Sequence, residues 1–201
     1  MIIIDNIAQL SPEWFKLKAG VPGASSFDKI VTSKGEPSKQ SQKYLYQLAG
    51  EAIVGDKMET YTNPTMQRGI ELEEEARSLF EVINNIEVQQ VGLCFANEQK
   101  KYLCSPDGLL PDSGLEIKCP LIHTHIEYLL NNKLPAEYVQ QVQGSMLVTG
   151  FKSYYFMSYY PGLNPLIIKV ERDESFIAKL GAELEAFCLS LAILIRKLKE
   201  L

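Results

Sequence analysis

Residues 104–119 read CSPDGLLPDSGLEIKC, a stretch typical of a hairpin that ends in a short buried strand. The PDSG at its centre has turn composition, and the LEIKC behind it alternates as a strand does. Side chains two residues apart on a strand share a face, so Glu116 and Lys118 point one way and Ile117 points into the core. Asp107 precedes the turn and can return to the same face. Two carboxylates and an ammonium group therefore converge.

These three groups fit the hydrolysis of a phosphodiester bond. Hard divalent cations prefer oxygen ligands, so Asp107 and Glu116 can hold Mg²⁺, which lowers the pKa of bound water and polarises a phosphoryl oxygen. Lys118 can orient that water or steady its deprotonated form as a local positive charge. The alternative is a solvated edge strand, because a bare Asp and Glu-x-Lys pattern also arises by chance. The apolar residues that flank each member favour the catalytic interpretation.

Length and composition indicate one ordinary globular domain. The chain has 201 residues, of which 46% are apolar and 22% are charged, with 13 Gly and 10 Pro. That length suffices for one well-buried α/β core and is short for two, so we expect a single domain over residues 1–201. The net charge of −5 does not exclude a nucleic-acid substrate. Bound cations offset metal-binding carboxylates, and basic residues need to cluster only where a strand passes.

Cysteine usage and the lack of long apolar runs predict a cytoplasmic protein with reduced thiols and no membrane segment. The four cysteines form no CxxC pair and have no histidine at metal-ligand spacing, which argues against a zinc or iron–sulfur site. The first residues, MIIIDNIAQLSPEWF, lack the basic start of a secretory signal. No apolar run reaches the length of about 18 residues that a membrane-spanning helix needs.

Hydrophobic periodicity predicts a mixture of helices and strands. Helices are expected from Ser11-Pro12 to about residue 17 and over residues 27–31, 43–54, 64–83, 125–130, 136–149 and 175–201. Strands are expected over residues 86–95, 102–104, 115–119, 153–159 and 166–172, the first three as an antiparallel meander, and residues 32–42 as a solvated loop. The fold class is α/β (α+β), with a mixed, largely antiparallel central sheet flanked by helices and the site at one edge.

CSPDGL followed by GLEIKCP resembles the PD-(D/E)XK nuclease superfamily, whose fold is restriction-endonuclease-like, and in particular the lambda-exonuclease and YqaJ-type recombination nucleases. Residues 69–77, GIELEEEAR, are similar to the family's G-x-x-x-E-x-x-A-R helix. The acid of that motif is a metal ligand, and its position here is Glu73. The neighbouring acids Glu71, Glu74 and Glu75 fit a solvated helix face better.

A second helix motif follows the strand. Residues 138–143, YVQQVQ, resemble the family's Y-x-x-Q-x-Q helix. The resemblance implies that Gln141, on one face with Tyr138, bonds phosphate or metal-bound water, and that Gln143 is a further phosphate contact. The alternative is that both amides lie on an exposed face.

The N-terminal stretch from Trp14 to residue 26 is similar to the family's W-x-x-x-R-x-G-x-x-T-A-S. Lys18 stands where arginine is usual, and Gly23 replaces threonine. A lysine contacts phosphate as a point charge and cannot offer arginine's bidentate fork, so the grip on a terminal 5′-phosphate is expected to differ. Ser25 and Ser105 are further candidate phosphate contacts.

Four further features of the sequence bear on DNA or metal binding. Met66 corresponds to an apolar residue that wedges between bases at the duplex fork, with core packing as the alternative. Lys34, together with Lys39, could grip the displaced strand, although surface lysines are usually nonspecific. His123 and His125 are expected to be polar surface residues. The aromatic residues of 154–160 are expected to pack in the core rather than stack on bases.

The resemblance implies a Mg²⁺-dependent exonuclease with two metal ions, for which Mn²⁺ can substitute. It implies 5′-to-3′ action on ends of linear double-stranded DNA that leaves a 3′ overhang for recombination. It further implies a ring-shaped homotrimer, a single-strand annealing protein as partner, and a phage or prophage origin in a bacterial host. Two alternatives stay open: a restriction- or repair-type endonuclease with the same triad, and a non-catalytic DNA-binding relic of the fold.

Overall fold

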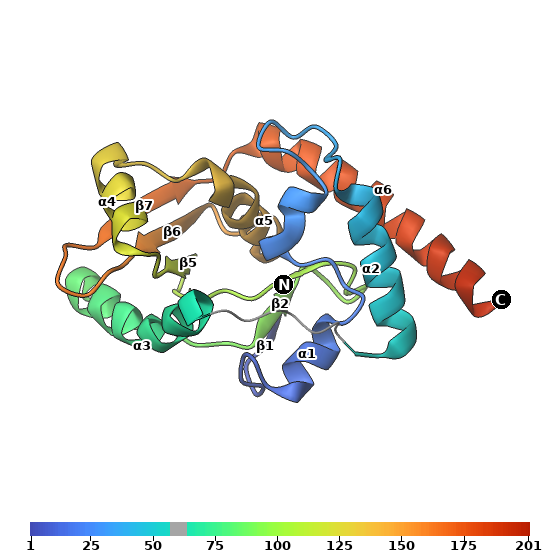
Figure 1. Cartoon of the computed structure of the whole chain (residues 1–201), viewed down its shortest axis with the longest axis horizontal. Helices are drawn as coiled ribbons and strands as arrows, with labels where there is room; N and C mark the ends of the chain where they lie inside the picture. Colours follow the sequence, from blue (N-terminus) through green and yellow to red (C-terminus); the bar gives the residue numbers. More distant parts are fainter. Residues whose placement is uncertain (57–63) are drawn as a thin grey trace.

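The computed structural model describes residues 1–56 and 64–201, without the side chains of Thr65 and Met66. Figure 1 shows the chain coloured from its N-terminus to its C-terminus. In chain order the elements are β1 (Ile2–Ile4), α1 (Pro12–Lys18), the 3-10 helix η1 (Ala24–Lys29), α2 (Ser41–Val54), α3 (Pro64–Asn84), β2 (Leu93–Phe95), β3 (Leu103–Cys104), β4 (Gly108–Leu109), β5 (Ser113–Lys118), α4 (Ile122–Asn131), η2 (Ala136–Tyr138), α5 (Val139–Thr149), β6 (Ser153–Ser158), β7 (Leu166–Glu171) and α6 (Glu174–Lys199).

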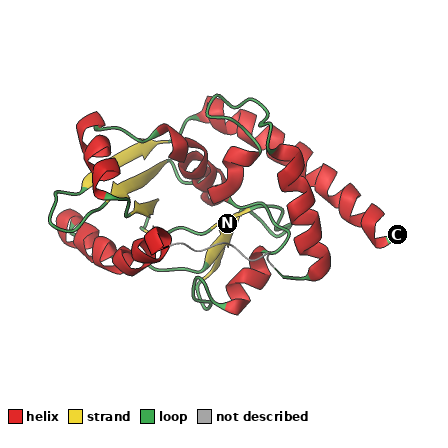
Figure 2. Cartoon of the chain, viewed as in Figure 1, coloured by secondary structure: helices red, strands yellow, loops and turns green. Residues whose placement is uncertain are grey.

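The larger sheet has four strands in the order β4-β5-β6-β7. The pairs β4/β5 and β6/β7 are antiparallel, whereas β5/β6 is parallel. A parallel pair needs a long crossover, and here α4, η2 and α5 supply it. Figure 2 shows these strands in yellow with helices around them. The prediction of a mixed sheet flanked by helices is confirmed.

The predicted antiparallel meander is correct for its first pair of strands, β2 and β3, and wrong for the third strand, β5. β2 and β3 belong to a separate three-stranded sheet in the order β1-β2-β3, in which Ile3 pairs with Cys94 and Cys94 with Cys104. The chain leaves this sheet at Ser105 and Pro106, where proline has no N–H to continue a ladder. β5 therefore pairs with β4 and β6 instead.

The two faces of the larger sheet are covered by different helices. Ala76 and Phe80 of α3 pack against Leu115 and Ile117 of β5 in one buried cluster. On the other face, residues of α5 pack against β6; this cluster consists of Val142, Met146, Tyr154, Phe156 and Ile177. Ile117 thus points into the core as predicted, and the aromatic residues Tyr154 and Phe156 are fully buried.

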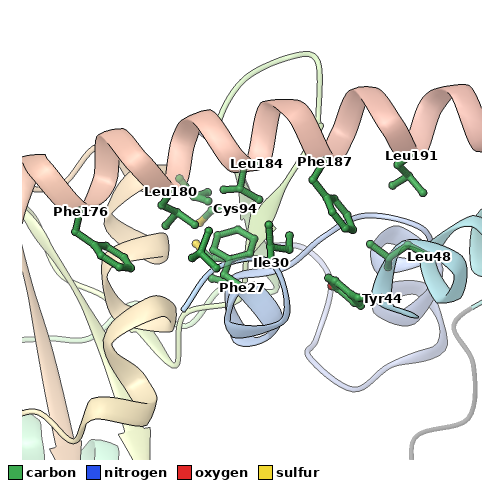
Figure 3. Close-up of a cluster of buried hydrophobic side chains, with 14 of the residues drawn as sticks. Phe27, Ile30, Tyr44, Leu48, Cys94, Phe176, Leu180, Leu184, Phe187 and Leu191 are labelled. Atoms are coloured by element: carbon green, nitrogen blue, oxygen red, sulfur yellow. The ribbon is translucent and has the colours of Figure 1, made fainter. Parts of the chain in front are cut away.

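A third cluster joins the C-terminal helix to the N-terminal half of the chain. Its α6 members recur every three or four residues: Phe176, Leu180, Leu184, Phe187 and Leu191. That spacing forms one helical stripe. Figure 3 shows the stripe above Phe27 of η1, Ile30 directly after η1, and Tyr44 and Leu48 of α2. This packing holds α6 against η1 and α2.

One surface prediction needs correction. His125 is completely buried, with Nδ1 2.8 Å from the Ser158 hydroxyl and Nε2 3.1 Å from the carbonyl oxygen of Asn164. Because α4 already begins at Ile122, His125 falls on its inward face, while His123 is exposed as predicted. Within residues 1–56 and 64–201, no helix has the length and apolar character needed to cross a membrane.

Candidate active site

Asp107 lies where the chain enters the β4–β5 hairpin, and hydrogen bonds to β5 hold it there. Its N–H donates to the carbonyl oxygen of Leu115 (3.0 Å). The N–H of Ile117 donates to Asp107 Oδ2 (2.6 Å). The side chain is therefore fastened directly beside Glu116, as the hairpin pattern predicted.

Glu116 and Lys118 share the face of β5 that looks toward α5. Lys118 Nζ lies 2.5 Å from Glu116 Oε1. Nε2 of Gln141, on α5, donates a hydrogen bond to the same oxygen at a distance of 2.5 Å. Glu116 is 1% exposed, and its other oxygen, Oε2, is buried without a hydrogen-bond partner in the described part of the chain. A buried, unpaired carboxylate oxygen is costly unless something binds it.

Glu73 reaches the site from α3. Arg77 lies one turn further along this helix, and its Nη2 atom is 2.5 Å from Glu73 Oε1. The Nε of Arg77 donates to the main-chain oxygen of Asp107 (2.9 Å). Arg77 thus links the helix to the hairpin. The sequence interpretation used Arg77 only as a motif residue, although its position four residues after Glu73 signals such a pair.

The segment between β1 and α1 forms one wall of a cleft beside the carboxylates. The cleft has a volume of about 460 Å³ and lies between residues 5–9 and the side chains of Glu73, Arg77 and Asp107. Nε2 of Gln9, in this wall, donates to the carbonyl oxygens of Val91 and Pro106, and both hydrogen bonds are 2.9 Å long. Sequence reasoning did not identify this residue, because its partners are remote in the chain.

The carboxylates of the site resist ionisation. Burial, followed by the charge of Asp107, raises the pKa of Glu73 to about 7. Burial raises the pKa of Glu116 to about 8 even though Lys118 opposes the shift, and burial also raises the pKa of Asp107. Burial alone would lower the pKa of Lys118, but the charges of Glu116 and Asp107 raise it, so Lys118 stays protonated. Close, desolvated acids favour a bound cation.

These donors fit a divalent metal ion of the Mg²⁺ type, which prefers oxygen ligands. The unpartnered Oε2 of Glu116 offers one such ligand. Among the described residues, no three His, Cys, Asp or Glu side chains already form a complete ligand cage. Arg77 forms an ion pair with Glu73, and Lys118 forms an ion pair with Glu116.

A second, smaller cavity contains the predicted end-binding residues. Lys18 and Ser25 line a volume of about 90 Å³ together with Lys29 and Glu51. Lys18 Nζ lies 3.8 Å above the centre of the Trp14 ring. The hydroxyl oxygen of Ser105 is buried, with no hydrogen-bond partner within residues 1–56 and 64–201. Lys18 and Ser25 are therefore brought together in one cavity, whose lining differs from that of the cleft at Glu73 and Asp107.

Other predicted residues are not gathered at the site. Gln143 is buried. Its amide donates to the carbonyl oxygen of Glu171 and accepts from the N–H of Asp173, and both hydrogen bonds are 2.9 Å long. The prediction that Gln143 contacts phosphate is wrong. The side chain points from α5 toward the end of β7, where it has a structural role. Lys34 is exposed in the loop before α2 and lines neither cavity. The side chain of Met66 lies outside the described residues.

Comparisons with known proteins agree with this arrangement. The YqaJ-like viral recombinase domain family matches residues 13–152. An alkaline exonuclease from Laribacter hongkongensis, LHK-Exo, is 33% identical, with 94% of this chain and 97% of that chain covered and a TM-score of 0.85. Its complex with dAMP gives 32% identity over the same shares and a TM-score of 0.84.

A phage related exonuclease from Haemophilus somnus 129PT has the same fold at 17% identity, with 89% of this chain and 96% of that chain covered and a TM-score of 0.70. No curated protein matches the chain. The family match includes Glu73, Asp107, Glu116 and Lys118. The chain therefore belongs to the YqaJ-like viral recombinase domain family and has the PD-(D/E)XK type of fold found in the alkaline exonucleases.

Proposed function

We propose that this nuclease is a metal-dependent exonuclease that degrades one strand of linear double-stranded DNA from its ends. The observation that carries the proposal is the meeting of Glu73, Asp107, Glu116 and Lys118 at the β4–β5 hairpin. A hydrolytic centre and a small pocket lined by Lys18 and Lys29 in the same chain suit a substrate with a free end. The exonuclease names of the similar structures support the same reaction class.

Glu73, Asp107 and Glu116 would hold Mg²⁺, in two ions, with Mn²⁺ as a substitute. Bound metal supplies an activated water and offsets charge on the phosphoryl oxygens. The chain's own residues prepare this site: Gln141 holds one oxygen of Glu116, and Arg77 holds one oxygen of Glu73.

Lys118 is the one group of the triad that carries a positive charge. Its Nζ lies beside the buried Glu116 carboxylate, and its side chain is still 28% exposed, so it can reach a substrate. We assign it two tasks: orienting the attacking water and stabilising the charge that develops on the phosphate. Its raised pKa keeps the ammonium form available for both.

We further propose 5′-to-3′ polarity with a 3′ overhang as product. The support is the pocket in which Lys18 and Ser25 meet, and the place of Ser105 two residues before Asp107 in the sequence. A homotrimer, a single-strand annealing partner and a phage or prophage origin within the bacterial cytoplasm complete the proposal. The viral recombinase family supports the phage or prophage origin, and the homotrimer and annealing partner rest on the resemblance of the sequence motifs.

Linear duplex DNA carrying a label at either the 5′ or the 3′ end would test this function. With Mg²⁺, we expect early release of 5′-labelled mononucleotides, faster from a 5′-phosphorylated end, and none after chelation with EDTA. A covalently closed circle should survive under the same conditions. Cutting of the circle would instead support the endonuclease alternative, and inactivity on every substrate would support a non-catalytic relic. Asp107→Asn is the matched inactive control.

A further inference from the structure

Gln9 makes long-range contacts that no predicted motif accounts for. It lies between β1 and α1, yet its Nε2 donates to main-chain oxygens 82 and 97 residues further along the chain, those of Val91 and Pro106. A primary amide nitrogen has two hydrogens, so these two bonds use its whole donor capacity. One side chain thus joins the N-terminal segment to the residues just before β2 and to the residues that lead into the catalytic hairpin.

The segment that carries Gln9 is itself firmly anchored. β1 pairs with β2 before it, and the N–H of Gly92 donates to the Ile4 carbonyl oxygen (2.8 Å). After it, Trp14 Nε1 donates to the Gly92 carbonyl oxygen (2.8 Å). A Cβ atom at Gly92 would lie 2.4 Å from the Ile7 carbonyl oxygen, so glycine allows this close approach. Gln9 therefore extends from a rigid support.

The second acceptor of Gln9 is the carbonyl group immediately before Asp107. The next carbonyl, that of Asp107 itself, accepts from Arg77, and the Asp107 N–H donates to the Leu115 carbonyl oxygen. Both peptide groups that flank the Asp107 Cα are consequently fixed by side chains or by β5. When both flanking peptides are fixed, the direction of the Cα–Cβ bond is fixed too, and so is the origin of the carboxylate.

We infer that Gln9 is a positioning residue that sets the place of the Asp107 carboxylate for metal binding. The inference rests on the proposed function, since it assigns Asp107 to the metal. Metal affinity depends on outer partners that orient the ligands, and losing such a partner commonly weakens binding by about 10-fold to 100-fold. Gln9 acts through the main chain, so we expect an effect near the lower limit of that range, about tenfold.

The test compares Gln9→Met with wild type. Methionine has nearly the same length and volume but cannot donate to either carbonyl oxygen. Mn²⁺ affinity is measured by electron paramagnetic resonance on the full chain without DNA, and Mg²⁺ dependence is measured in the nuclease assay. Gln9→Met should weaken Mn²⁺ binding about tenfold and raise the half-activating Mg²⁺ concentration by a similar factor. The matched control is Gln99→Met, at an exposed glutamine in the β2–β3 turn.

A double-mutant cycle separates positioning from general stability. In an Asp107→Asn background, Gln9→Met should weaken Mn²⁺ binding no further, because the ligand through which it acts is already lost. Equal effects in both backgrounds, or a lower melting temperature of Gln9→Met with unchanged Mn²⁺ affinity, would overturn the inference. If Gln9→Met does not fold, Gln9→Asn, too short to span both acceptors, is measured with the same expectations. Failure of wild type itself to bind Mn²⁺ would instead refute the proposed function.

Discussion

The catalytic hairpin and the Lys18 pocket differ in how they hold their charged side chains. At the hairpin, Glu116 is 1% exposed, and burial raises the pKa of all three carboxylates. In the pocket, Lys18 and Lys29 are partly exposed and lie over the aromatic rings of Trp14 and Tyr44. One region concentrates buried charge, and the other presents cations on aromatic supports.

The difference matters because buried charges depend strongly on their partners, whereas exposed charges contribute little each. Residues of the hairpin should therefore be hard to replace, while residues of the pocket should adjust affinity or end preference. The Lys18 pocket also has an acid in its wall: Glu51 is buried and accepts from the N–H of Gly20 (3.3 Å) and from Gln47 Nε2 (2.8 Å). Four predictions test this contrast, in order of expected effect.

Lys118→Ala should have the largest effect. Removing one preorganised charge from an active site typically costs roughly 100-fold to 1,000-fold in rate, and we expect that loss in nucleotide release from duplex ends. Lys101→Ala is the matched control, because Lys101 pairs with Glu185 on the surface at 41% side-chain exposure. Wild-type rates in Lys118→Ala would show that the hairpin is not the hydrolytic centre.

Glu73→Gln should weaken Mg²⁺ activation by about 10-fold to 100-fold, because the amide keeps the shape but loses the charge of a metal ligand. Its neighbour Glu74→Gln is the control, since Glu74 is exposed on the same helix. Mg²⁺ titration of the initial rate gives the half-activating concentration for each variant. Equal values for the two variants would remove Glu73 from the metal site.

The hairpin should also make the metal-free protein less stable at high pH. In the folded state the pKa of Glu116 is about 8 and that of Glu73 is about 7, both above the ordinary 4.5. The folded chain therefore holds more protons than the unfolded chain in this window, so its stability falls as pH rises through it. These groups add no further loss above about pH 8.

Melting temperatures measured from about pH 5 to about pH 9 would test this trend. We expect a fall of a few degrees without metal, a smaller fall with Mg²⁺, and a flatter curve for Glu116→Gln. Mg²⁺ should stabilise most at the alkaline end, because it competes with protons for the carboxylates. A metal-free melting temperature that rises toward alkaline pH would contradict the sign derived for these acids.

Lys18→Ala should have the smallest effect. A partly exposed lysine contributes one phosphate contact, so we expect the preference for 5′-phosphorylated over 5′-hydroxyl ends to fall by about threefold to tenfold. Lys18→Arg should preserve or increase the preference, since arginine offers a bidentate contact. Lys16→Ala, exposed on the same helix, is the control. An unchanged preference in Lys18→Ala would separate this pocket from end recognition.

Local geometry made much of the hairpin predictable. The two-residue period of a strand puts Glu116 and Lys118 on one face and Ile117 on the other, and the structure has them there. The spacing of apolar residues likewise predicted the helix that carries Glu73 and the last helix, α6. These features depend on neighbours within a few residues, so covalent geometry and side-chain chemistry suffice to infer them.

Packing across the chain settled the remaining features. The pairing of β1 with β2, the burial of His125 and the turning of Gln143 away from the site depend on which surfaces meet. Gln9 is the extreme case, because its acceptors lie 82 and 97 residues away. The chemistry of the hairpin is thus a property of the local sequence. The fixed position of the hairpin in the molecule depends on contacts that form only when segments distant in the sequence pack together.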